Sequence, residues 1–94
     1  NEMGNGQWKA WTRQQLAEKT RPLKKELEQI DKRLAALSAE RTALEQKLTE
    51  TLPPAEIAEC GRRLKAGNEE TEKLEERWLE ISSELEEISA TSVG

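Results

Sequence analysis

The sequence predicts an all-α protein, in which two long helices pack as an antiparallel coiled-coil hairpin. The composition favours helices, because charged residues make up 36% and hydrophobic residues 34% of the 94 residues, while Phe, Tyr and His are absent. Such a chain has too little apolar bulk for a rounded core. Its apolar residues are nevertheless regularly spaced, which predicts order rather than a disordered polar chain.

The first helix is predicted from a heptad pattern. Leucine or isoleucine recurs every seven residues at Leu16, Leu23, Ile30, Leu37 and Leu44, with Leu27, Leu34 and Leu48 between them. These alternating steps of three and four form the apolar seam of a coiled coil, interrupted by Thr20 and Arg41. Pro22 lies inside the run, so we expect the first helix to kink or to restart there.

A second seam follows the prolines of Leu52-Pro53-Pro54 and runs through Ile57, Cys60, Leu64, Gly67, Thr71, Leu74, Trp78, Ile81, Leu85 and Ile88. Proline ends a preceding helix and suits the first turn of the next one. We therefore expect a first helix at about 7–51, a turn at 52–54 and a second helix at about 55–90, together a hairpin over 7–90. Residues 1–6 are expected to be a disordered tail, and 91–94 a frayed one.

The alignment of the two seams is predicted from the position of the turn. Residues whose numbers add to 108 would face each other, which places Leu34 against Leu74 and the bulky Arg41 against Gly67. Trp78 occupies a seam position in this alignment and is predicted to belong to the core.

The sequence offers almost no catalytic chemistry. It lacks His, and its single Cys60 lies in the seam, so neither a zinc site nor a Cys/His nucleophile is predicted. Carboxylate pairs such as Glu75-Glu76 are interpreted as a solvated helix face rather than as acid/base groups. No glycine-rich phosphate loop is present. We expect no enzyme activity, no catalytic residue, no metal and no cofactor in this chain.

The location is predicted from similar absences. A lone cysteine fits a reducing compartment, and no apolar run reaches the length that spans a membrane. The chain begins with Asn1 rather than Met, which suggests a piece of a longer protein. We expect a cytoplasmic monomer that makes no contact with membrane.

Charge is distributed unevenly along the chain. Residues 8–25 hold six basic residues and one acidic residue, a net charge of +5, while residues 69–88 hold nine acidic and two basic ones, a net charge of −7. The basic residues are candidate contacts for a phosphate backbone; they are Lys9, Arg13, Lys19, Arg21, Lys24 and Lys25. Trp8 and Trp11 are candidate stacking surfaces. The opposite interpretation is that the basic and acidic stretches attract each other across the hairpin and fix its pairing.

A second basic cluster offers an alternative contact. Arg62, Arg63 and Lys65 lie near the predicted turn, where they would reach farthest from the chain ends. A third possibility is that the tryptophans contact another protein domain, since two exposed tryptophans favour some partner.

The run Leu16-Ala17-Glu18-Lys19-Thr20-Arg21-Pro22-Leu23-Lys24-Lys25-Glu26-Leu27 resembles the opening of the C-terminal coiled-coil domain of ABC-F ATPases, of the Uup and YheS type. The segment Glu75-Glu76-Arg77-Trp78-Leu79-Glu80 is similar to the tryptophan-containing part of the second helix in that family. The resemblance extends over roughly residues 9–90, with Pro22 and Trp78 as its most specific positions.

This resemblance implies a soluble parent protein with two ATP-binding cassettes, which would bind ATP and Mg and would act on the ribosome during translation. It also implies that the arm contacts DNA or ribosomal RNA through the basic positions of the first helix, or contacts its own ATPase domains. Two alternatives remain open. Leu37-Ser38-Ala39-Glu40-Arg41 and the Pro-Pro turn also resemble the tRNA-binding hairpin of a seryl-tRNA synthetase, and a protein-only scaffold would use the outer faces to bind another helix.

Overall fold

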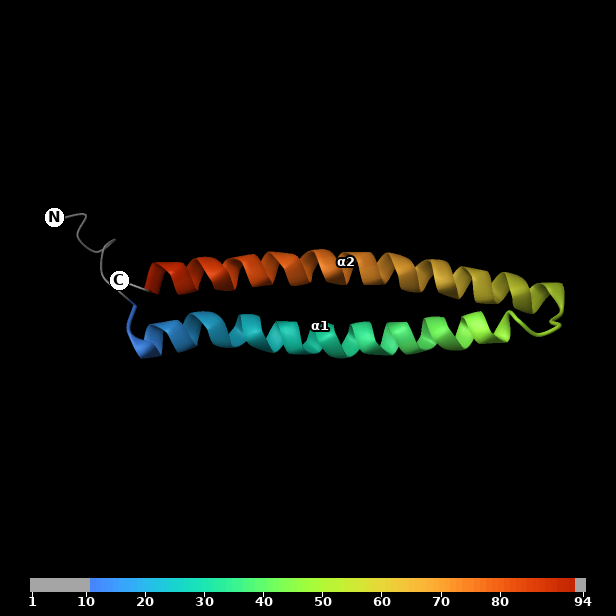
Figure 1. The fold of residues 1–94 in the computed structure, drawn as a ribbon, viewed down its shortest axis with the longest axis horizontal. Helices are drawn as coiled ribbons and strands as arrows, with labels where there is room; N and C mark the ends of the chain where they lie inside the picture. The colour runs from blue at the N-terminus through green and yellow to red at the C-terminus, as the bar shows by residue number, and fades with distance from the viewer. Residues whose placement is uncertain (1–10, 93–94) are drawn as a thin grey trace.

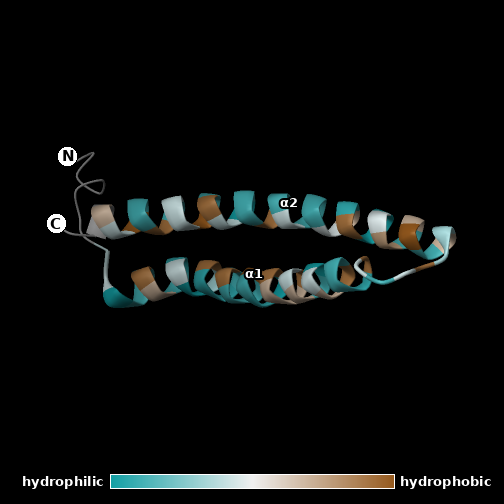
Figure 2. Cartoon of the chain, turned by 45° about the vertical axis from the view of Figure 1, so that its right-hand side comes forward, coloured by the Kyte–Doolittle hydropathy of each residue, from teal (hydrophilic) through white to brown (hydrophobic). Residues whose placement is uncertain are grey.

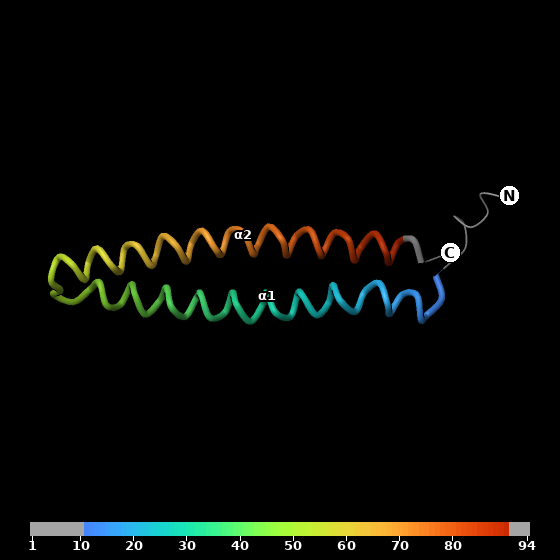
Figure 3. The backbone as a smooth tube through the Cα atoms, turned by 180° about the vertical axis from the view of Figure 1, so that it is seen from behind, coloured from blue at the N-terminus to red at the C-terminus, as the bar shows by residue number. Residues whose placement is uncertain are grey.

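The predicted fold class is confirmed: a computed structural model, which describes residues 11–92, shows two antiparallel helices (Figure 1). Helix α1 covers Arg13–Lys47 and helix α2 covers Pro54–Ser92. The described part measures 72 × 19 × 15 Å. Seen from either side, the helices lie next to each other over their whole length (Figures 1 and 3). We call the end with the turn the tip and the opposite end the base.

Helix α1 begins at a capping box. The Oγ1 atom of Thr12 accepts a hydrogen bond from the Gln15 backbone N–H at 3.1 Å, and the Gln15 side chain accepts one from the Thr12 N–H at 2.9 Å. These two bonds satisfy amide groups that a helix start leaves without partners. The helix therefore begins at Arg13, after the position near residue 7 that the apolar pattern indicates; residues 7–10 lie outside the described part.

The turn comes earlier than the prolines alone indicate. Helix α1 ends at Lys47, where the Thr49 side chain donates a hydrogen bond to the Gln46 carbonyl at 2.6 Å. Pro54 is the first residue of α2, one residue before the predicted start at about 55. The Pro53 carbonyl then accepts hydrogen bonds from the N–H groups of Glu56 and Ile57. Proline fits this first turn because its missing N–H has no partner there in any helix.

Helix α1 is continuous through Pro22, so it does not restart at that residue. Pro22 has no N–H for the Glu18 carbonyl, and both residues lie on the exposed side of the helix, where that carbonyl can be hydrated. Two residues earlier, the Thr20 hydroxyl donates a hydrogen bond to the Leu16 carbonyl at 2.8 Å. A helix of 35 residues packed along its whole length tolerates the loss of one hydrogen bond.

The core is a single thin seam between the helices (Figure 2). Most hydrophobic residues lie on the sides of the helices that face each other, and hydrophilic residues predominate on the outer sides. Within residues 11–92 five side chains are buried, and all of them belong to the two predicted apolar patterns: Ile30, Leu37, Leu44, Cys60 and Ile81. Ile81 is completely buried, at 0% exposure. Most other seam leucines are half-buried, because a pair of helices can enclose only one row of side chains.

One edge of the hairpin is lined with ion pairs that join the helices. We call this the paired edge. From base to tip the pairs are Glu26–Arg77 at 2.8 Å, Arg33–Glu70 at 2.6 Å, Glu40–Arg63 at 2.9 Å and Lys47–Glu56 at 3.4 Å. Each successive pair lies one heptad farther along both helices, and the charge on each helix alternates in sign. All of the pairs join residues whose numbers add to 103.

The predicted alignment, with numbers adding to 108, is wrong. Besides the ion pairs, a Cβ built on Gly67 would lie 3.9 Å from the Cδ2 atom of Leu37, a pair whose numbers add to 104. Gly67 thus lies against Leu37 rather than Arg41. The charges explain the alignment: sliding one helix by a heptad would bring Glu26 toward Glu84 and Arg33 toward Arg77, which are like charges.

Candidate nucleic-acid interface

The basic candidates on the first helix lie on the first four turns of α1, at the base. Five of them are in the described part, and each is exposed; they are Arg13, Lys19, Arg21, Lys24 and Lys25. Lys9 and the candidate stacking residue Trp8 lie outside the described residues. From Arg13 to Lys25 the helix rises by about 18 Å. This stretch holds five of the fourteen basic residues in the described part of the chain.

These five cations are not part of the ion pairs that join the helices. The ion pairs within residues 11–92 use Arg33, Lys47, Arg62, Arg63 and Arg77 instead. The interpretation that the basic stretch fixes the antiparallel pairing therefore does not match the structure, since other residues do so. Four more cations without such a pair are scattered singly along the hairpin: Lys32, Arg41, Lys65 and Lys73.

Trp11 and Lys19 contact each other at the base. The Nζ atom of Lys19 lies 4.9 Å from the centre of the Trp11 ring, a cation–π distance. Trp11 is half-buried rather than fully exposed. One side of the Trp11 ring therefore contacts Lys19, which reduces the value of Trp11 as a stacking platform for a base. The same contact holds the Lys19 ammonium group at the base of the hairpin.

The alternative basic cluster at the tip is largely neutralised. Arg62 contacts Glu59 at 2.6 Å within α2, and Arg63 contacts Glu40 of α1 at 2.9 Å. Only Lys65 of this cluster has no ion pair among the described residues. A phosphate group approaching the tip would have to compete with these carboxylates, whereas at the base of α1 it would not.

Electrostatics along the paired edge follow from the hydrogen bonds. Arg77 donates two hydrogen bonds to Glu26, at 2.8 and 3.0 Å, and they lower the pKa of that carboxyl below its ordinary value. Arg33 acts in the same way on Glu70 and lowers its pKa. The two arginines have raised pKa values for the same reason. These charged groups already have partners within the hairpin, so they fix the alignment of the two helices rather than bind a ligand.

The described residues contain no metal-binding constellation. No group of three or more His, Cys, Asp or Glu side chains within residues 11–92 is placed to hold a metal ion. Cys60 is a free, buried thiol in the seam, where it packs as a small apolar side chain. No described helix is long and apolar enough to span a membrane.

Comparison with known protein families decides between the two resemblances. Residues 18–83 match the family described as the ABC transporter C-terminal domain. The chain belongs to this family. The match includes both Pro22 and Trp78 and extends across both helices, so the hairpin is the family domain itself rather than a tRNA-binding arm. Comparisons with curated proteins and with solved structures gave no match.

The ABC transporter C-terminal domain occurs in ABC-F proteins of the Uup and YheS type, as the sequence resemblance indicates.

The prediction that Trp78 belongs to the core is wrong. Trp78 was expected in the core, yet 38% of it is exposed, and its neighbour Leu79 is 63% exposed. A thin seam between two helices cannot enclose a side chain as large as that of Trp78, so part of it stays exposed.

Proposed function

We propose that this domain contacts nucleic acid, DNA or ribosomal RNA, through the base of α1. It belongs in this proposal to an ABC-F protein whose two cassettes, outside this chain, bind ATP with Mg and hydrolyse it. The domain itself is a non-catalytic arm. The carrying observation is that Arg13, Lys19, Arg21, Lys24 and Lys25 are exposed and have no carboxylate partner within residues 11–92, while other arginines of the hairpin form ion pairs.

The length of the basic stretch suits a phosphate backbone. About 18 Å of helix corresponds to roughly five phosphates of one strand at about 3.4 Å each. Lys24 and Lys25 follow Arg21 by three and four residues, so both are neighbours of Arg21 on the helix surface. Contacts of this kind neutralise phosphates without reading bases, so binding is weak and independent of sequence.

The opposite helix restricts binding to one side. Residues 69–88 of α2 carry nine acidic and two basic residues, and the outward carboxylates near the base repel phosphate. Nucleic acid therefore approaches the domain from the α1 side. Dissociation constants of about 1–100 μM are expected, as for other contacts dominated by counterion release.

The proposal is tested by fluorescence anisotropy with a labelled DNA duplex and a labelled RNA hairpin at low salt. The variant with Arg21, Lys24 and Lys25 all changed to Glu should lose at least about tenfold in affinity for both. Its control reverses Arg62, Arg63 and Lys65 and so changes net charge equally at the tip. Circular dichroism verifies that both variants remain helical. Equal losses in the two variants, or no binding by the unmodified chain, would disprove contact at the base.

A further inference from the structure

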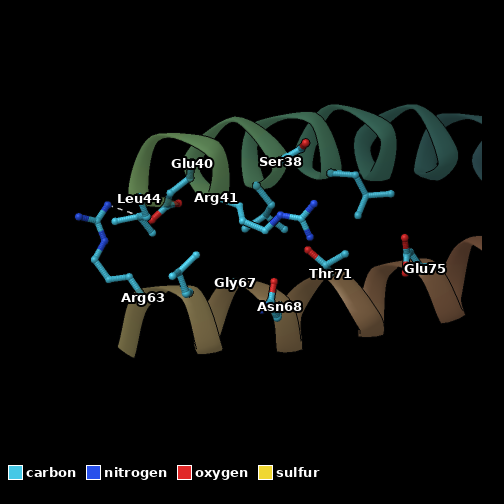
Figure 4. Close-up of a pocket in the computed structure, with 12 residues that line it drawn as sticks. Ser38, Glu40, Arg41, Leu44, Arg63, Gly67, Asn68, Thr71 and Glu75 are labelled. Carbon is cyan, nitrogen blue, oxygen red and sulfur yellow. Dashed lines mark hydrogen bonds and ion pairs between the residues drawn. The ribbon is translucent and has the colours of Figure 1, made fainter. Parts of the chain in front are cut away.

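The edge opposite to the ion pairs is open. We call it the open edge, and its residues next to the seam are mostly short or unpaired: Asp31, Ser38, Gly61, Asn68, Glu75 and Ser82. Along it two cavities follow one another and share Leu34 and Glu75 as lining residues. Figure 4 shows the first, where Arg41 lies along the space between the helices toward Thr71 and Gly67 leaves room.

The surface that lines the second cavity is more apolar than the surface that lines the first. It has a volume of about 440 Å³ and is lined by Leu34, Trp78 and Leu79, with Asp31 and Glu75 at its rim. Trp78 is 38% and Leu79 63% exposed, which makes them the largest exposed apolar pair on the described chain. We call these five residues the Trp78 hollow. A tryptophan and a leucine exposed side by side favour a partner.

We propose that the Trp78 hollow docks a basic amphipathic segment of another protein. In this arrangement an apolar side chain of the partner enters the hollow between Leu34, Trp78 and Leu79. A lysine or arginine beside it contacts the carboxylates of Asp31 and Glu75. This surface is separate from the basic stretch at the base of α1.

Charge complementarity identifies the occupant. Neither Asp31 nor Glu75 forms an ion pair with another described residue, because Arg33 and Arg77 pair with Glu70 and Glu26 on the paired edge. Around Leu79, one or two turns away on the same helix, are Glu72, Glu76 and Glu86. A cationic segment would neutralise these charges, and cations are also attracted to aromatic rings such as that of Trp78.

The same charges argue against other occupants. Phosphate would be repelled by the carboxylates, so nucleic acid does not suit this surface. An acidic helix would add like charge next to Asp31 and Glu75. The same surface of a second copy would also bring acidic residues together, which disfavours a symmetric dimer through the hollow.

Trp78 itself reports on binding when the other tryptophans are removed. The experiment uses the full chain with Trp8→Phe and Trp11→Phe, so that fluorescence comes from Trp78 alone. The probe is a synthetic amphipathic helix with leucine on one face and lysine on the other. One control peptide replaces its leucines by serine, and another replaces its lysines by glutamate.

The proposal predicts a saturable blue shift of Trp78 emission with the leucine–lysine peptide and little shift with either control peptide. Leu79→Lys should weaken binding at least about tenfold. Ile57→Lys is the matched control, because Ile57 is a 48% exposed apolar residue of the same helix near the tip, and this variant should bind like the parent. Both variants are verified as helical by circular dichroism.

Four outcomes would overturn the proposal. They are equal binding of the serine peptide, which would indicate bulk charge alone; equal binding of the glutamate peptide; equal losses in the Leu79 and Ile57 variants; and a blue shift that grows with protein concentration without peptide, which would indicate a second copy as the occupant.

Discussion

Replacing Ile81 with alanine tests whether the seam is the main source of stability. Ile81 is 0% exposed, so the change removes three buried carbon atoms at about 0.8 kcal/mol each and leaves a cavity. Alanine recovers a few tenths of this through its helix propensity. The free energy of unfolding should therefore fall by about 2–3 kcal/mol, measured by urea titration followed by circular dichroism at the helix band.

Leu79→Ala is the control for this prediction. Leu79 lies two residues away on the same helix but is 63% exposed, so the same assay should show a loss below about 1 kcal/mol. Two variants with equal losses would contradict the seam as described, because burial would then not distinguish Ile81 from Leu79. A small effect at both positions would show that the helices are not packed along this row.

Three further predictions follow from the helix contacts. Gly61→Ala and Gly67→Ala should each stabilise by up to about 1 kcal/mol in urea titrations, because a Cβ meets nothing within 4 Å at Gly61 and only Leu37 at 3.9 Å at Gly67; destabilisation would contradict this packing. Arg33→Glu should lower the melting temperature, and adding Glu70→Arg should restore part of it; a double variant no better than either single one would contradict the alignment. The lowered pKa values of Glu26 and Glu70 give stability that is present above their ordinary pKa of 4.5 and is lost as pH falls through the lower folded value. Melting curves in acid should show this loss, and Arg33→Gln should reduce it.

The hairpin itself could be predicted because its signals are local. The heptad spacing from Leu16 to Leu48 defines one apolar stripe, and Pro54 marks the start of the next helix without reference to any distant contact. The capping box of Thr12 and Gln15 is also local, because its two partners lie three residues apart, and it places the helix start at Arg13 where the apolar spacing does not.

The alignment of the helices could not be predicted from the apolar seams alone. Seams of similar leucines pack almost equally well after a slide of half a heptad, and matching Arg41 with Gly67 appeared favourable by size. The decisive signal was the charge pattern beside the seam. Glu26, Arg33, Glu40 and Lys47 alternate in sign at seven-residue spacing, as do their partners on α2, which selects one alignment.

The candidate site was predicted in composition but not in its environment. The sequence indicates the basic residues of the first helix and, as an alternative, those of the tip. Which of them are free depends on carboxylates that are distant in sequence, such as Glu40, which contacts Arg63 from the other helix. The exposure of Trp78 likewise depends on how little of it the first helix, α1, covers, which no local sequence pattern indicates.

The salt dependence of nucleic-acid binding tests the central claim most directly. The five described cations at the base of α1 can together neutralise up to five phosphates of duplex DNA. In a plot of the logarithm of the binding constant against the logarithm of the salt concentration, the slope should then be negative and no steeper than about −4.5. Changing Arg21, Lys24 and Lys25 to Gln should make this slope shallower by about 2.7. An unchanged slope in that variant, or binding that does not depend on salt, would contradict a phosphate-contacting base.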